Sequence, residues 1–391
     1  MIKDYVVKNS SILDVTSGVL KRGNIFVEDG IIKEVSNSPD MQAEKIIDAD
    51  GMIVTPGWVD AHVHIYYDDK CIGVDPQTYL IPNGVTYAID PGTAGAENFE
   101  DFYDYVRLNT DLKYKSYLNI SKIGIPILGY ELTDMSNIDI NLFKSIFNKY
   151  KSELMGVKVR ITDNMCSDPL SALEVVSKLS RELNTTCCVH PTRSKLSTET
   201  ILSYMKKGDV FTHCFALSSS GILDSNGKVK DAVWEAKERG VIFDIGHGTN
   251  SFSFEVAQSA IEQGFKMDII SSDLHVGNVD GPVYDLPTTL SKILCLGIEI
   301  DEILRLVTVA PTKLLNLEDK SLKIEIGQPA DFTVFQIEKG KYTYIDSARQ
   351  TITGDERIIP MYTCVGNKIF TPRKKRQKNQ IIGQEAQKIT K

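Results

Sequence analysis

The sequence lacks several features that mark particular classes of protein. No apolar run approaches the length of about 20 residues that a transmembrane helix needs. The first residues, Met1 to Tyr5, show no apolar segment of the kind found in signal peptides. The seven cysteines form no Cys-x-x-Cys pair. We therefore expect a cytoplasmic protein with reduced thiols and no membrane partner.

Acidic residues outnumber basic residues except at one end of the chain. The net charge is −8, and residues 373–391 carry seven Lys or Arg and one Glu, a net +6, so the rest of the chain carries −14. An acidic body argues against nucleic acid as the main partner. The polar, basic segment 373–391 is predicted to be disordered. The composition leaves a homo-oligomer open.

Short strand-like runs occur near both ends of the chain. Residues 1–54 contain several, with an Asp-Gly turn at residues 29–30 between two of them. Similar runs return in residues 321–372. Neither group has enough strands to be stable alone. We therefore predict one small β-sandwich domain, built from residues 1–54 together with residues 321–372.

Between these groups, residues 55–320 alternate apolar strands with amphipathic helices. One helix is well marked, since Asp168 can cap it, Pro169 can begin it and apolar residues follow at helical spacing. The expected strands are 56–64, 84–90, 116–120, 156–161, 185–190, 209–213, 240–247 and 267–273. This alternation predicts an α/β fold, a (β/α)8 TIM barrel. The alternative, an open doubly wound sheet, lacks support because no Gly-x-Gly-x-x-Gly motif is present.

Histidine is rare, and its placement is regular. Each of the six histidines ends an apolar, strand-like run: His62, His64, His190, His213, His247 and His275. In a barrel the active site lies at the C-terminal ends of the strands, where these side chains and Asp273 would converge. His62 and His64 share one face of their strand and could bind a divalent metal ion, while His190 and His213 could bind a second. Taken singly, each of these histidines is more often a core or rim histidine.

Asp273 ends an apolar run and needs a partner there. It could cap the following helix or pair with a cation. The functional interpretation is a metal ligand that also takes a proton from metal-bound water, whose pKa zinc lowers to about 7.

Lys158 and Arg160 alternate with two valines in one strand. Because the valines suit the outer helices, both cations should point inward. A buried, unpaired amine loses its charge and can capture carbon dioxide as a carbamate, which could bridge two metal ions. The simpler interpretation of Lys158 is a lysine paired with a carboxylate. Arg160, and His247 between two glycines, are candidate donors to a polar or anionic group of the substrate. His247 could equally be a core histidine.

These residues occur in a familiar order. His62-x-His64, Lys158, His190, His213 and Asp273 resemble the amidohydrolase superfamily, in its binuclear subtype with a carbamylated lysine. The resemblance implies two divalent ions, zinc in the first instance. It places the first ion on His62, His64 and Asp273, the second on His190 and His213, and a carbamate of Lys158, formed from carbon dioxide, between them.

Three motifs, at residues 156–160, 244–248 and 281–289, resemble the deacetylase-like group of that superfamily, which is related to dihydroorotases. The resemblance implies hydrolysis of an amide or ester (acyl) bond, other than a peptide bond, in a small polar or anionic substrate. A metal-bridging hydroxide would attack, with Asp273 as general base. N-acyl amino acids and acyl hydroxy acids are the expected substrates.

Three alternatives remain. A cyclic amidohydrolase of dihydroorotase type typically has an arginine two residues after the second histidine, but here His64-Ile65-Tyr66 stands. A deaminase would have a catalytic Glu near His190, and none is present. A non-catalytic assembly protein on the same fold would have lost metal ligands, whereas this sequence keeps them all.

Overall fold

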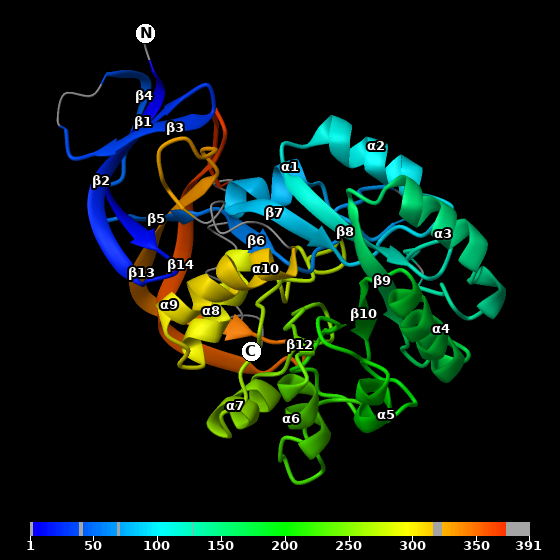
Figure 1. Cartoon of the computed structure of the whole chain (residues 1–391). Coiled ribbons are helices and arrows are strands. Elements are labelled where there is room, and N and C mark those ends of the chain that lie inside the picture. The colour runs from blue at the N-terminus through cyan, green and yellow to red at the C-terminus, as the bar shows by residue number, and fades with distance from the viewer. Residues whose placement is uncertain (1–2, 39–41, 69–70, 128, 316–322, 373–391) are drawn as a thin grey trace, which may run out of the picture.

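The structure contains two β-sheets with helices around one of them (Figure 1). It is a computed structural model, and it describes residues 3–38, 42–68, 71–127, 129–315 and 323–372. The basic segment that the sequence predicts to be disordered, residues 373–391, lies outside this range. None of the described helices is both long and apolar enough to cross a membrane.

The first sheet has eight strands and takes them from both ends of the chain. Its order is β15-β14-β13-β5-β1-β2-β3, and β4 pairs with β1 outside this path. The strands are β1 (Lys3–Asp14), β2 (Val19–Glu28), β3 (Ile31–Ser36), β4 (Ala43–Asp48), β5 (Ile53–Pro56), β13 (Phe332–Ile345), β14 (Thr351–Val365) and β15 (Lys368–Phe370). One core is formed by a group of their buried side chains, among them Tyr5, Val27, Val54 and Phe332.

The strands of the predicted small domain form one continuous, branched sheet, because β1 is long enough to pair with two strands along the same edge. This sheet packs against itself, since the rings of Tyr5 in β1 and Phe332 in β13 lie 6.3 Å apart. Its first half, from Lys3 to Lys8, pairs with β4, and its second half pairs with β5 at Ser11 and Ile12. An irregularity between Val7 and Ser10 separates the two halves.

The second sheet is parallel and has seven strands in chain order. They are β6 (Trp58–Asp60), β7 (Val85–Asp90), β8 (Lys113–Asn119), β9 (Leu154–Arg160), β10 (Thr186–His190), β11 (Val210–Phe211) and β12 (Ile242–Phe243). The eighth expected strand, residues 267–273, is not a regular strand. It makes one parallel bridge from Ile269 to Asp244, and the next residue, Leu274, makes another to Val63. The segment thus contacts both edges of the sheet, and side-chain bonds, such as Ser272 N to Asp60 Oδ1 at 3.0 Å, replace part of the ladder.

Helices surround the parallel strands (Figure 1). They are α1 (Pro76–Tyr79), α2 (Phe99–Asn109), α3 (Ile140–Lys149), α4 (Pro169–Glu182), α5 (Thr198–Ser203), α6 (Asp231–Glu238), α7 (Phe254–Glu262), α8 (Leu286–Cys295), α9 (Ile300–Leu306) and α10 (Val309–Leu314), with short 3-10 helices at Ile81–Asn83 and Met135–Asn137. The predicted start of α4 is confirmed, since Asp168 accepts a hydrogen bond from Ser171 N at 3.1 Å and Pro169 begins the helix.

The chain passes from one sheet to the other at Gly57. The sequence predicts a single strand over residues 56–64, but the structure divides this region between β5 and β6. A Cβ atom at Gly57 would lie 2.0 Å from the hydroxyl oxygen of Thr86, so only glycine fits here. His62 and His64 therefore follow the end of β6 and do not lie within a strand.

Candidate metal centre

The six predicted metal-site residues converge at the C-terminal ends of the parallel strands. His62, His64, Lys158, His190 and Asp273 line one cavity of about 400 Å³. His213 adjoins it, with Nε2 lying 2.8 Å from His190 Nδ1. The topology explains the convergence, because parallel strands bring their C-terminal ends to one edge of the sheet.

Asp273 lies at the centre of the cluster. Its Oδ1 atom is 3.2 Å from His64 Nε2 and 3.6 Å from His62 Nε2. One nitrogen each of His62 and His213, together with a carboxylate oxygen of Asp273, lie within 4.8 Å of one another. The sequence assigned His62 and His213 to different ions. Their proximity means that the two ligand sets adjoin.

Each of the four imidazoles is held from outside through one ring nitrogen and presents the other to the cluster. The outer bonds run from His62 Nδ1 to Asp244 Oδ2 (3.1 Å), from His64 Nδ1 to Thr93 Oγ1 (2.6 Å), from His190 Nε2 to Thr192 Oγ1 (2.6 Å) and from His213 Nδ1 to Gly246 O (2.6 Å). Such outer partners fix the ring orientation of metal-ligating histidines. The donor set therefore fits divalent metal ions.

Electrostatics agrees with this interpretation. Burial lowers the pKa of His213 to about 3 and also lowers the pKa of His62 and His190. Neutral imidazole is the form that binds a metal. Burial alone would raise the pKa of Asp273, but the surrounding histidines hold it well below the ordinary value. His62, His190 and His213 therefore offer neutral nitrogen ligands beside the carboxylate anion of Asp273.

Two of these residues have strained backbones. His213 has φ 62° and Asp273 has φ 48°, in the left-handed region that residues other than glycine rarely adopt. Such strain costs about 1–3 kcal/mol per residue and tends to occur at functional sites. Gly248 makes room for the carboxylate, because a Cβ atom there would lie 2.4 Å from Asp273 Oδ2.

Lys158 is buried, and the described part of the chain gives it no ion pair. It is 1% exposed, and its Nζ atom lies 3.6 Å from Cys188 Sγ. Among the described residues, no carboxylate forms an ion pair with it. The backbone of Gly92 packs against the lysine stem, since a Cβ atom there would lie 2.6 Å from Lys158 Cβ. The interpretation as a paired structural lysine therefore gains no support from the described part of the chain.

The two predicted substrate contacts have different surroundings. Arg160 lines the cavity, but Nε and Nη2 are bound by buried Glu131, the latter to Oε2 at 2.6 Å. His247 is fully buried outside the cavity lining, with Nε2 2.8 Å from Lys292 Nζ and its ring stacked on Phe252. The structure thus brings Arg160 to the site and places His247 behind it. His275 also lines the cavity.

Three buried aspartates that the sequence analysis missed support the cluster. Asp244 orients His62, and although burial opposes its ionisation, hydrogen bonds from His62, Ser271 and Thr212 lower its pKa. Asp60 accepts a bond from Ser272 N, and burial raises its pKa to about 7. Asp90 accepts the backbone N–H of Ile65 at 3.0 Å and the hydroxyl of Thr93 at 2.7 Å. Each ends or directly follows a short apolar strand, so the pattern that identified the histidines could have found them.

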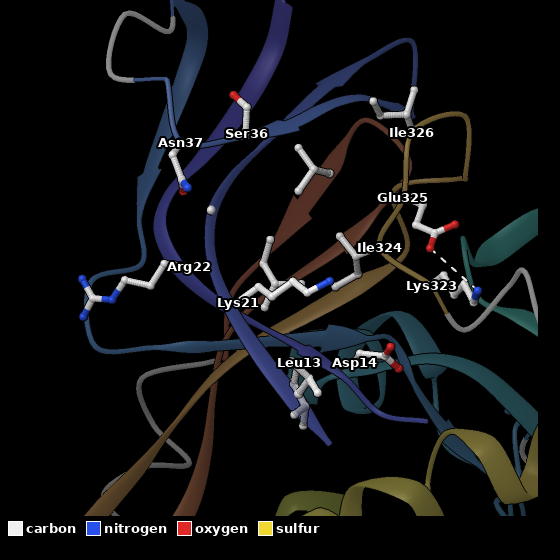
Figure 2. A pocket seen from close by; sticks show the side chains of 14 residues that line it. Leu13, Asp14, Lys21, Arg22, Ser36, Asn37, Lys323, Ile324, Glu325 and Ile326 are labelled. Carbon is white, nitrogen blue, oxygen red and sulfur yellow. Dashed lines mark ion pairs between the residues drawn. The ribbon is translucent and has the colours of Figure 1, made fainter. Parts of the chain in front are cut away.

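A second cavity, of about 560 Å³, lies in the branched sheet (Figure 2). Residues of β1, β2 and β3 and the segment 323–326 line it, and Lys323 pairs with Glu325 at 3.7 Å. None of its lining residues is a histidine. It therefore offers no comparable set of metal ligands.

Comparisons with known proteins identify the family. Residues 324–371 match a family described as a deacetylase-like composite domain. The chain is 38% identical to a deacetylase of Enterococcus faecalis over 330 residues, which cover 82% of this chain and 87% of the relative. The chain belongs to the deacetylase-like family of the amidohydrolase superfamily. This deacetylase-like chain is also 30% identical to a deacetylase of Brucella anthropi over 348 residues, which cover 88% of this chain and 86% of the relative.

Solved structures extend the comparison. The deacetylase-like chain superposes on a crystal structure of an adenine deaminase with a TM-score of 0.85 and 34% identity, over 94% of this chain and 100% of the other. A dihydroorotase structure gives a TM-score of 0.87 and 28% identity, over 94% and 97%. A D-hydantoinase, at 14% identity, TM-score 0.61 and 95% of both chains, shares the fold. The protein is thus an amidohydrolase, a hydrolase of carbon–nitrogen bonds.

Proposed function

We propose that this amidohydrolase removes an acyl group from a small anionic substrate by hydrolysis of an amide or ester bond. Two divalent ions, zinc in the first instance, would be held by His62, His64 and Asp273 on one side and by His190 and His213 on the other. One observation carries the proposal: four imidazoles, each held from outside through one ring nitrogen, turn the other nitrogen toward a cluster that contains one carboxylate.

The ions would lower the pKa of a bound water and polarise the acyl carbonyl. Asp273 would act as the base. Its low pKa keeps it ionised at neutral pH, so the carboxylate can accept a proton from the attacking water and return it to the leaving nitrogen or oxygen. The strained backbone of Asp273 and the neighbouring Gly248 fix the position of this carboxylate.

Lys158 would carry the bridging group. Its amine nitrogen would attack the carbon of carbon dioxide, form a nitrogen–carbon bond and release one proton, which turns a neutral amine into an anion with two oxygens. The burial of Lys158 and the lack of a carboxylate partner among the described residues support this assignment. Such an anion would help to balance the positive charge of two divalent ions, which the single negative charge of Asp273 cannot balance.

The cavity wall supports an anionic substrate with an apolar part. Ile72, Ile125, Pro126, Ile127 and Met165 line the cavity together with two arginines, Arg160 and Arg193. Because Glu131 accepts from Nε and from one N–H of Nη2, Arg160 keeps both N–H groups of Nη1 and the second N–H of Nη2 to donate to a substrate carboxylate. The names of the deacetylase relatives agree with an acyl substrate. The runner-up, a cyclic amide, rests on the likeness to a dihydroorotase structure.

The remaining parts of the proposal concern architecture and location. The bridges that residues 267–274 make to both edges of the parallel sheet support closure into a (β/α)8 barrel over residues 55–320. Residues 1–54 and 321–372 would form the composite second domain. Seven free cysteines, six of them buried, support a cytoplasmic location.

The test is a substrate screen. Protein loaded with zinc and bicarbonate would be offered N-acyl amino acids, acyl hydroxy acids, neutral acyl amides and dihydroorotate. We expect cleavage of the anionic acyl compounds, and Arg160→Met should lower kcat/KM for these about 10-fold or more while changing neutral substrates little. Turnover of dihydroorotate with no acyl substrate cleaved would reject the proposal.

A further inference from the structure

The turn between β13 and β14 reaches from the branched sheet to the metal centre. These two strands form a long hairpin that runs past α8 (Figure 1). Its turn, residues 346–350, contacts the segment 246–254, which follows β12 and adjoins the cluster. We infer that Asp346 and Ser347 are positioning residues, which hold this segment so that the cavity wall and Asp273 keep their places.

Three hydrogen bonds and one longer polar contact join the turn to the segment. The Ser347 hydroxyl donates to Gly248 O at 2.9 Å and lies 3.4 Å from His247 O. Ser347 N donates to Phe252 O at 3.0 Å, and Phe254 N donates to Asp346 Oδ2 at 2.9 Å. Asp346 is fully buried, and its Oδ1 accepts Gln350 N within the turn. The turn thus holds the segment at both ends.

The segment it holds forms part of the site. Thr249, Asn250 and Ser251 line the cavity. Gly248 N donates to Ser272 O at 3.1 Å, directly before Asp273, and Gly248 leaves the space that Asp273 Oδ2 needs. A displacement of Gly248 would therefore move both the cavity wall and the carboxylate.

A second attachment acts on the same segment from α8. Lys292 Nζ donates to His247 Nε2 at 2.8 Å and to Pro282 O at 2.6 Å. The helix is itself bound to the hairpin, since Ile358 N of β14 donates to Ser291 Oγ at 3.0 Å. His247 therefore acts as a fixed point between α8 and the segment, which accounts for its burial away from the cavity.

A matched pair of variants tests the inference. Ser347→Val removes the hydroxyl, and Ser347→Thr keeps it on a side chain of the same shape. Thr343→Val removes a hydroxyl from the same hairpin, where it pairs with Thr353 at an exposed position. Two quantities would be measured on the full chain: amide hydrogen exchange over residues 246–254, and kcat and KM for the acyl substrate.

We expect Ser347→Val to speed exchange at Gly248 about five- to tenfold and to lower kcat/KM by a similar factor, mainly through kcat, because Asp273 shifts. Ser347→Thr should restore both quantities, and Thr343→Val should change neither. Unchanged exchange in Ser347→Val would overturn the inference. So would faster exchange with unchanged kcat/KM, or an equal effect of Thr343→Val.

The kinetic part rests on the proposed function, and the exchange part does not. If the parent protein cleaves no acyl substrate, the proposed function fails. The rate at which a chelator removes bound zinc would then be measured in place of kcat and KM. Faster loss in Ser347→Val than in Ser347→Thr would then support the positioning of Asp273, and equal loss would overturn it.

Discussion

The carboxylate of Asp273 lies among the imidazoles of His62, His64 and His213. Asp273→Asn keeps its shape but cannot accept a proton, so we expect kcat to fall about 10³-fold. Zinc content measured by elemental analysis should fall less than in His62→Ala, which loses a nitrogen ligand. Turnover near that of the parent would exclude Asp273 as the base.

Two substitutions of Lys158 test the proposed carbamate, because they differ in the space that they leave. Lys158→Ala removes the amine and opens a cavity, whereas Lys158→Met removes the amine and fills it. Both should lose activity. Short carboxylic acids should restore part of it in Lys158→Ala alone, since a carboxylate can take the place of the carbamate there. Full activity in either variant without additives would exclude the carbamate.

The sequence could predict the cluster but not all of its support. The six cluster residues each follow a strand-like run or lie within one, which is a local pattern. The pairing of Arg160 with Glu131 could not be predicted, since Glu131 comes from a loop 29 positions earlier in the chain. The burial of His247 depends likewise on Lys292, 45 positions later. Contacts of this kind are set by tertiary packing.

At the scale of helices and strands, side-chain hydrogen bonds and strand pairing explain why the observed strands differ from the predicted ones. The run at residues 267–273 has the apolar pattern of a strand, but Asp273 adopts a left-handed backbone and Ser272 bonds to Asp60. These bonds interrupt the ladder. In the hairpin, the strand-like runs expected within residues 321–372 include one continuous strand, β13, because β14 pairs with it from Phe332 to Ile345.

The crossing of the chain from β5 to β6 at Gly57 leads to a prediction about stability. Gly57→Ala would place a methyl group against the side chain of Thr86, and overpacking of this kind costs about 1–3 kcal/mol. We expect a lower Tm in calorimetry. Combining the change with Thr86→Gly should recover part of the loss relative to the sum of the two single changes. If the loss in Tm of the double variant equals the sum of the losses of the two single variants, the contact between residues 57 and 86 does not cause the destabilisation.

At the scale of the whole molecule, the fold alone leaves the substrate open. An adenine deaminase, a dihydroorotase and a D-hydantoinase structure all superpose on this chain. Similar folds host different chemistries, and the residues around the site decide among them. Here the distinguishing features are Arg160 and Arg193 beside an apolar wall, and the absence of an arginine two residues after His64.

The last prediction concerns metal content and its effect on stability. The adjoining ligand sets should hold close to two divalent ions per chain after loading with zinc and bicarbonate. Because ions that bind the folded chain alone stabilise it by mass action, their removal with a chelator should lower Tm by about 10 °C. Lys158→Met should bind fewer ions and show a smaller shift, since it lacks the bridging group. One ion per loaded parent chain, or a shift equal in parent and variant, would contradict a binuclear site, because the His62, His213 and Asp273 group can by itself hold a single ion.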